Sequence, residues 1–302
     1  MCSQPSFPLS PYQDAIAMPP FFTIITSTYN AAATLPRLLD SLASQTCRDF
    51  NWIVQDGASS DATMQIVEQY RDRLPTVLAN SSEDRGIYDA WNKVLEFRRD
   101  EIGEWVLFLG ADDMLAADTV LNDIKGELAT VPDEVIFYAG KLNLVDYDSV
   151  PEKGSLKKTS HKIKFSRRFF DMPFQHPALF QRKYVLLQYK FDPTFKIAGD
   201  YDFILRSWKT EEQAQESDIL VTCMALNGIS TAPQFRKKCH QEFLRVIQKN
   251  LRISSILGVE RILILLNAYC FEQKNIVKKY IPRRIIDTFF LYASKIYSLM
   301  KR

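Results

Sequence analysis

The sequence predicts an α/β fold with a mostly parallel, doubly wound sheet and a helical C-terminal extension. Three short apolar runs without alternation, at 21–26, 50–54 and 104–109, have the pattern of strands buried on both faces of a parallel sheet. Stretches with helical spacing of apolar residues separate these runs. Strand and helix alternating at this pace imply right-handed crossovers between parallel strands.

The first part of the chain alternates regularly. The predicted elements are strand 21–26, helix 31–44, strand 50–54, helix 62–73, strand 75–79, helix 87–99 and strand 104–109. Beyond residue 114 the alternation weakens. There we expect strands at 135–139, 141–147 and 219–222, a basic surface loop or flap at 153–168, a helix at 203–208 and helical structure from 239 onward.

Composition excludes several classes of protein. The apolar content of 46% and charged content of 25% are those of an ordinary soluble globular protein. A net charge of +2 argues against a nucleic-acid partner, which needs a concentrated basic surface. The cysteines are 5 in number and form no CxxC pair, so we expect neither a disulfide framework nor structural zinc, and a reducing cytoplasm.

The ends of the chain suggest no membrane span. Residues 1–20 contain no lysine or arginine and no apolar core, so a loose tail is expected rather than a signal peptide. No stretch approaches an uncharged transmembrane segment. After residue 272 the chain is basic with interleaved apolar residues, which suits either an anionic membrane surface or packing against the preceding domain or a second subunit.

A pair of adjacent acids follows the apolar run at 105–109. Asp112 and Asp113 come directly after this predicted strand, at the sheet edge where open α/β folds bind ligands. Neighbouring carboxylates repel each other and favour a cation, and their hard oxygens suit Mg²⁺ or Mn²⁺. The competing interpretation is that they cap a helix starting near Leu115.

Other polar residues are expected at the same edge. Thr28, Tyr29, Asp56 and Arg85 lie in the loops that follow the first three predicted strands. Neither a GxGxxG nor a GxxxxGK[ST] motif occurs, which argues against a dinucleotide oxidoreductase and a P-loop NTPase. A nucleotide bound here would need a carboxylate for its base and a metal ion for its phosphates.

Five motifs together resemble the family 2 glycosyltransferases of the GT-A fold, a Rossmann-like α/β fold. They occur in order over roughly residues 21–210, and their form looks most like bacterial enzymes of lipopolysaccharide, capsule or exopolysaccharide synthesis. The motifs are Ile-Thr-Ser-Thr-Tyr-Asn (25–30), Gln-Asp-Gly-Ala-Ser-Ser-Asp (55–61), Ser-Glu-Asp-Arg-Gly-Ile-Tyr-Asp-Ala-Trp-Asn-Lys (82–93), Gly-Ala-Asp-Asp (110–113) and Gly-Asp-Tyr-Asp-Phe-Ile-Leu-Arg (199–206).

The resemblance implies a nucleotide-sugar donor site on the first half of the chain. Tyr29 and Asp56 would hold the base and ribose, and Ser27 and Thr28 would shape that wall. Arg85 would lie near the phosphates or the uracil. The expected parts of the chain are a tail at 1–20, a donor-binding half at 21–115, an acceptor-binding half at 116–235 and the basic helical extension at 236–302.

The resemblance also implies the catalytic groups. Asp112 and Asp113 would bind a divalent cation, Mn²⁺ or Mg²⁺, that bridges the donor diphosphate, with Asp113 the more direct ligand. Asp200 matches the general base that deprotonates the acceptor hydroxyl. Gly199 replaces the usual acid before this base, so Asp202 stays open as an alternative base, and His176 and Asp202 are candidate contacts to acceptor or diphosphate.

The expected reaction is the inverting, metal-dependent transfer of one sugar from a UDP-linked donor to a saccharide or lipid-linked acceptor in cell-surface polysaccharide synthesis. The chain lacks the Gln-x-x-Arg-Trp motif of processive synthases, so single-sugar transfer is expected. The alternatives are a catalytically silent sugar-nucleotide-binding partner and a nucleotidyltransferase. The enzyme is expected in the cytoplasm, peripheral to the inner face of the membrane if the extension binds lipid.

Overall fold

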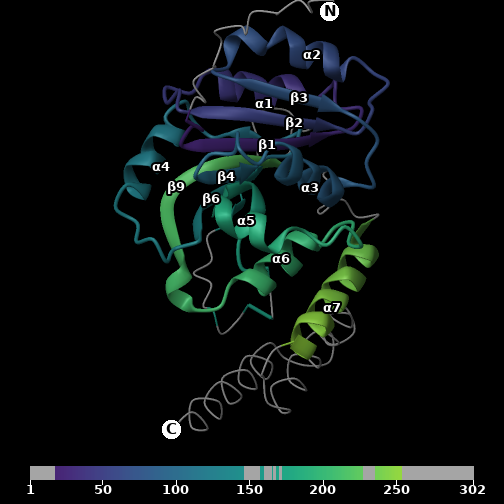
Figure 1. Ribbon diagram of the computed structural model, residues 1–302, viewed down its shortest axis with the longest axis vertical. Coiled ribbons are helices and arrows are strands. Elements are labelled where there is room, and N and C mark those ends of the chain that lie inside the picture. The colour runs from purple at the N-terminus through teal and green to yellow at the C-terminus, as the bar shows by residue number, and fades with distance from the viewer. Residues whose placement is uncertain are drawn as a thin grey trace, which may run out of the picture.

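A computed structural model describes residues 18–145, 157–159, 165, 168–169, 172–226 and 235–253. In these ranges a 9-stranded sheet runs in the order β3-β2-β1-β4-β8-β6-β9-β5, and β7 pairs with β6. Figure 1 shows helices on both sides of this sheet. The predicted α/β fold class is confirmed, and the prediction for the chain after residue 253 lies outside the described residues.

The four N-terminal strands are parallel, as predicted. β1 (Phe22–Thr28), β2 (Phe50–Asp56), β3 (Val77–Ser81) and β4 (Trp105–Phe108) are joined by crossover helices α1 (Leu35–Ala43), α2 (Thr63–Gln69) and α3 (Ile87–Phe97). Alternate residues of one strand enter different cores: Ile24 packs in one and Ile25 in the other. Burial on both faces explains why these strands are continuously apolar.

The two faces of the sheet are covered by different helices. Core residues of α1, α2 and α4 (Val120–Leu128) pack together on one face. Those of α3, α5 (Lys183–Tyr189) and α6 (Gly199–Ser207) pack on the other. Short 3₁₀ turns η1 (Arg71–Arg73), η4 (His176–Ala178) and η5 (Glu211–Gln213) complete this part.

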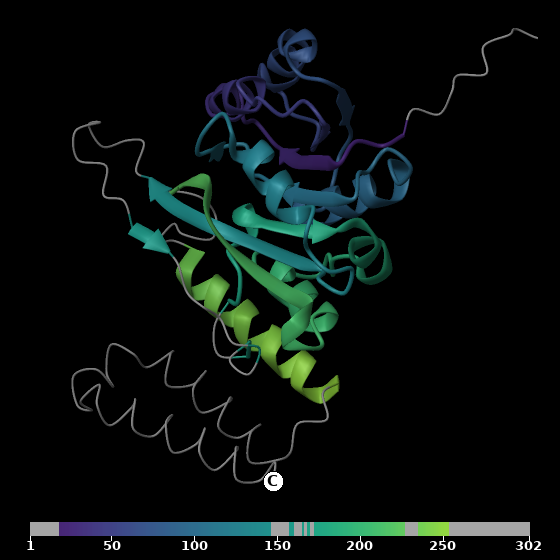
Figure 2. The same cartoon turned by 90° about the vertical axis from the view of Figure 1, so that its left-hand side faces the viewer.

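The second half of the sheet is mixed. β8 (Leu179–Arg182) runs antiparallel to β4 and β6, whereas β6 (Phe137–Val145) is parallel to β9 (Ala214–Ala225). Short strands β5 (Met114–Leu115) and β7 (Lys157–Thr159) pair antiparallel with β9 and β6. In Figure 2 the long strands β6, teal, and β9, green, lie side by side between the N-terminal strands and helix α7.

Four predicted elements differ from the structure. The strands predicted at 135–139 and 141–147 form the single strand β6, whose pairing with β9 shifts register around Gly140. A Cβ at Gly140 would clash with the side chain of Val221, so this glycine allows a close approach of β9 and does not end a strand. The strand predicted at 219–222 is the longer β9, and the helix predicted at 203–208 begins at Gly199.

Helix α7 (Arg236–Ile253) confirms the helical prediction for the start of the C-terminal extension. It packs beside α6, as Figure 1 shows. None of the described helices combines the length and apolarity that crossing a membrane would require. The predicted lipid-binding segment after residue 272 lies outside the described residues, and the four-part division of the chain stays a prediction.

Candidate functional site

The carboxyl ends of the first three strands meet at Asp56. Thr28, Asp56 and Ser81 lie opposite one another in the sheet register. The Asp56 carboxylate accepts hydrogen bonds from the Thr28 hydroxyl (2.8 Å), the Ser81 hydroxyl (2.7 Å), and the backbone N–H (2.8 Å) and hydroxyl (2.5 Å) of Ser59. Burial alone would raise the pKa of Asp56, but these hydrogen bonds outweigh it and lower the pKa.

An exposed aromatic ring stands next to this carboxylate. Tyr29 directly follows β1 and is 70% exposed, while Ser27 is partly buried within the strand. A Cβ added to Gly57 would lie 3.4 Å from the Tyr29 ring and 2.8 Å from Oδ2 of Asp84. The three residues therefore border one surface, on which a flat base could stack. The sequence pattern does not single out Asp84, because an acid in a loop carries no signal of its own.

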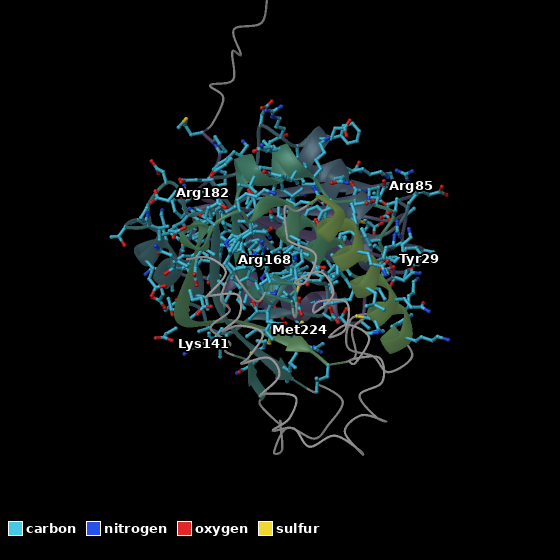
Figure 3. All side chains as sticks on the ribbon, turned by 90° about the horizontal axis from the view of Figure 1, so that it is seen from below. Tyr29, Arg85, Lys141, Arg168, Arg182 and Met224 are labelled. Carbon is cyan, nitrogen blue, oxygen red and sulfur yellow. The ribbon has the colours of Figure 1, made fainter. Side chains whose placement is uncertain are left out.

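Arg85 lies in the loop after β3 with a largely exposed side chain, on the same side of the molecule as Tyr29 in Figure 3. Its guanidinium pairs with Asp89 at 2.8 Å, and its backbone N–H donates to the same carboxylate at 3.0 Å. The Arg85 side chain is 78% exposed, whereas that of Asp89 is only 12% exposed. Asp89 would keep the Arg85 backbone N–H and the Lys93 ammonium at 3.8 Å if the Arg85 guanidinium turned to a ligand phosphate.

Asp112 and Asp113 converge at the end of β4. Asp113 is 3% exposed and accepts the Gly110 N–H at 2.7 Å. A Cβ added to Gly110 would lie 2.7 Å from Oδ1 of Asp112 and 3.0 Å from Oδ2 of Asp113, so both carboxylates face this glycine. Helix α4 begins only at Val120, after Thr119. The interpretation of these acids as caps of a helix starting near Leu115 is therefore wrong.

The electrostatics of this pair favour a cation. Burial, and secondly the charge of Asp112, raise the pKa of Asp113 to about 7, and no cationic side chain of the described residues offsets this rise. Their hard oxygens suit Mg²⁺ or Mn²⁺, so the donor set fits the expected metal. Within the described ranges no group of three or more His, Cys, Asp or Glu side chains gathers as a metal site. Phosphate and water oxygens would therefore complete the coordination.

Asp200 lies in the first turn of α6. Its Oδ1 accepts the backbone N–H of Tyr201 at 2.8 Å and lies 3.1 Å from the hydroxyl of Tyr88. Burial raises the pKa of Asp200 to about 6, close to the range in which a general base works at neutral pH. A Cβ at Gly199 would lie 2.7 Å from the Tyr88 ring, so this ring occupies the space that the family's usual acid would need.

The segment before α6 joins Asp200 to the loop after β3. Lys196 donates from Nζ to the carbonyl oxygen of Arg85. The hydroxyl of Tyr88, a residue in the first turn of α3, donates to the carbonyl oxygen of Ile197 at 2.7 Å. These contacts hold the start of α6 against the Arg85 loop, at the edge of the sheet where Asp56 lies.

Asp202 has a different environment from Asp200, although it is only two residues away. Its carboxylate is 0% exposed and binds Arg206 at 2.7 Å, Lys249 at 3.0 Å and the side-chain amide of Asn250 at 2.9 Å. Lys249 and Asn250 belong to α7, so Asp202 ties the two helices together. Since these partners occupy both of its oxygens, we retain Asp200 alone as the candidate base.

His176 lies among aromatic rings. It is 6% exposed, with ring centroids 5.0 Å from Trp91 and 5.2 Å from Phe108, and one ring nitrogen lies 3.2 Å from Nε2 of Gln181. Burial lowers the pKa of His176 to about 3, so the ring is neutral at physiological pH. These contacts are those of a core residue, and they give no support to a direct ligand contact.

Replacing Asp202 with alanine is expected to destabilise the protein by about 3 kcal/mol, because removing one member of a buried ion pair leaves its partners unpaired. Equilibrium unfolding in urea measures this loss. Asp123→Ala, on the exposed surface of α4, is the matched control and should change stability by less than about 0.5 kcal/mol. Equal midpoints for the two variants would show that Asp202 does not anchor α7.

Comparisons with known proteins agree with this arrangement. Residues 23–186 match the family model described as Glycosyl transferase family 2. A PGL/p-HBAD biosynthesis glycosyltransferase of Mycobacterium tuberculosis is 27% identical over 89% of this chain and 97% of its own length. The crystal structure of Staphylococcus aureus TarS 1–349 in complex with UDP-GlcNAc has a TM-score of 0.64 and 22% identity, covering 87% of this chain and 76% of the other.

A second solved structure is the mannosyltransferase PcManGT from Pyrobaculum calidifontis in complex with GDP-Man and Mn²⁺. Its TM-score is 0.60 at 18% identity, covering 92% of this chain and 81% of the other. At these identities the two structures establish the fold, while the family match covers the strands and loops that carry Asp56, Arg85, Asp112 and Asp113.

Proposed function

The chain belongs to glycosyl transferase family 2, and we propose from this premise that it transfers one sugar, with inversion, from a UDP-linked donor to a saccharide or lipid-linked saccharide acceptor. The observation that carries the proposal is that two acids, Asp113 and Asp200, have pKa values raised by burial. Asp113 follows β4 without a cationic partner among the described residues, and Asp200 stands at the start of α6.

The donor nucleotide would bind at the carboxyl edge of β1, β2 and β3. Tyr29 offers an exposed ring for stacking of the base, and Gly57 leaves room beside it. Asp56 is ionised and could accept a uracil N–H by exchanging one of its present donors, while Ser27 and Thr28 form the adjoining strand end. The exposed guanidinium of Arg85 would then meet the diphosphate.

Asp112 and Asp113 would hold the divalent cation against the diphosphate. When bound, the cation stabilises the negative charge that develops on the leaving nucleoside diphosphate. Asp113 must be ionised to serve as a ligand. Burial and the like charge of Asp112 raise the pKa of Asp113 and so disfavour its ionised form. A bound cation would offset both effects, so the pair favours cation binding.

Asp200 would accept the proton of the attacking acceptor hydroxyl. Its carboxylate is held by the Tyr201 N–H and lies beside the Tyr88 hydroxyl, so its orientation is fixed before the acceptor arrives. A single base opposite the leaving group is sufficient for direct displacement, which inverts the anomeric carbon. No covalent sugar–enzyme intermediate is needed, since no second acid has to act as nucleophile.

A role in cell-surface glycoconjugate synthesis is supported by the relatives. One group is named for PGL/p-HBAD biosynthesis, and another is the poly(ribitol-phosphate) β-N-acetylglucosaminyltransferase TarS of Staphylococcus aureus. TarS matches only 101 residues, which are 33% of this chain and 17% of its own length, so it supports a role in cell-surface synthesis and not the identity of the acceptor.

A donor panel tests the proposed function. Purified protein would be incubated with Mn²⁺ and UDP-GlcNAc, UDP-glucose, UDP-galactose or GDP-mannose, and release of nucleoside diphosphate measured with and without saccharide acceptors. We expect turnover of one UDP-sugar and slow or no release from GDP-mannose. If no donor is hydrolysed or transferred under any of these conditions, the proposal fails in favour of a silent sugar-nucleotide-binding protein.

A further inference from the structure

Helix α7 presents a buried carboxylate to the segment that leads into α6. Glu242 is 9% exposed and accepts three successive backbone N–H groups. The distances are 3.0 and 2.9 Å from Lys196, 2.7 Å from Ile197 and 3.0 Å from Ala198. Ala198 precedes the first residue of α6, so this carboxylate also satisfies donors at the positive end of that helix.

The same short segment is held from its other side by α3. The Tyr88 hydroxyl lies 2.7 Å from the carbonyl oxygen of Ile197 and 3.1 Å from Oδ1 of Asp200. The N–H of Ile197 therefore faces Glu242 while its carbonyl faces Tyr88. Two helices distant in sequence thus fix the backbone only a few residues before the base.

We propose that Glu242 is a positioning residue for Asp200: it clamps the backbone at 196–198 and thereby sets where the base meets the acceptor hydroxyl. This inference rests on the proposed function. Glu242 touches neither the base directly nor the expected donor surface at Tyr29 and Asp56. Sequence reasoning missed it because its partners are backbone groups 44–46 residues away.

The charge of Glu242 adds a second effect. Burial is the largest cause of the rise in the pKa of Asp200 to about 6, and the neighbouring negative charge of Glu242 adds a smaller contribution in the same direction. Among the described residues, the other ionisable or charged groups facing this region are Tyr88 of α3, Cys239 of α7 and Lys196, whose Nζ is hydrogen-bonded to the Arg85 carbonyl oxygen. The charge of Glu242 therefore makes Asp200 a stronger base, because it favours the protonated form of Asp200.

Two substitutions separate the effect of the length of the Glu242 side chain from the effect of its charge. Glu242→Gln keeps the length of the side chain and removes its charge, so the pKa of Asp200 should fall. The acid limb of the pH–rate profile should move to lower pH by the same amount. Glu242→Asp keeps the charge but is one methylene shorter, so kcat should fall by about tenfold with KM for the donor unchanged, and the acid limb should stay near its wild-type position.

Asp192→Asn is the matched control. Asp192 also binds α7, through Lys249 at 2.8 Å, but it does not contact the segment 196–198. We expect the acid limb of the pH–rate profile of Asp192→Asn to lie at the same pH as that of the wild type. If Glu242→Gln lowers the rate while the limb and KM behave as in this control, Glu242 only stabilises the fold and the inference is wrong.

A measurement without turnover keeps this inference separate from the proposed function. In protein labelled with ¹³C at aspartate carboxyl groups, the Asp200 signal can be assigned by its absence from Asp200→Asn and then titrated. We expect its pKa to be lower in Glu242→Gln than in the wild type and Glu242→Asp. Identical titrations in wild type and Glu242→Gln would refute the charge effect, even in a protein that turns over no donor, and a wild-type kcat in Glu242→Asp would refute the clamp.

Discussion

Replacing Asp200 with asparagine is expected to reduce sugar transfer by about 10²–10⁴-fold, the usual contribution of a positioned general base. Asparagine keeps the shape of the side chain and cannot accept the proton of the acceptor hydroxyl. Wild-type activity should also fall as the pH drops through about 6, because the base works only as a carboxylate and burial raises the pKa of Asp200 to that value. Initial rates of the Asp200→Asn and wild-type enzymes against pH test both statements.

The loss should lie in catalysis and not in donor binding. Asp200 lies at the start of α6, and UDP is expected to bind at the ends of β1 to β3, so UDP should protect Asp200→Asn and the wild type from thermal unfolding to the same extent. A variant that retained more than about a tenth of the wild-type rate would exclude Asp200 as the base.

Replacing Asp113 with asparagine is expected to abolish metal-dependent protection by UDP. In the wild type, UDP with Mn²⁺ at about 100 times its dissociation constant should stabilise the folded protein by about 2.7 kcal/mol, and a chelator should remove this effect. The variant lacks the buried carboxylate that would bind the cation, so UDP should not protect it at these concentrations. Thermal unfolding with Mn²⁺ or a chelator present measures the difference.

The same variant should be at least as stable as the wild type without metal. Burial and Asp112 raise the pKa of Asp113 to about 7 from a model-peptide value of 3.8, so the native state binds the proton more tightly than the unfolded state. Wild-type stability is therefore lost as pH rises from about 4 through 7, and the relative stability of Asp113→Asn should grow over that window. Asp123→Asn, an exposed control on α4, should keep the metal-dependent protection. Protection that persists in Asp113→Asn would refute its role as a ligand.

The first half of the fold was predictable because strands that are buried on both faces have continuously apolar sequences. Trp52 and Ile53 are neighbours on β2, yet both are buried, in opposite cores. Such strands deliver Thr28, Asp56 and the acids after β4 to one edge, so these positions followed from chain order alone. The roles given to these residues stay predictions.

The second half was less predictable because its signals depend on distant partners. The sequence predicts separate strands at 135–139 and 141–147, but Gly140 between them is the point at which β9 approaches β6 closely. β8 and α5 were not predicted, because stretches of four and seven residues are too short to show a recognisable hydrophobic periodicity. Asp202 could not be separated from Asp200 by sequence, because what distinguishes it is Lys249 and Asn250 on α7.

The central claim is that Asp56, Asp113 and Asp200 serve one donor bound at the carboxyl edge of the sheet. A crystal structure of the protein with UDP and Mn²⁺, with the metal located by its anomalous scattering, tests it most directly. We predict the manganese peak in bonding contact with Asp113 and the diphosphate, the uracil against Tyr29, and Asp200 facing the vacant sugar position. Manganese bound away from Asp113, or UDP bound away from Tyr29 and Asp56, would contradict the claim.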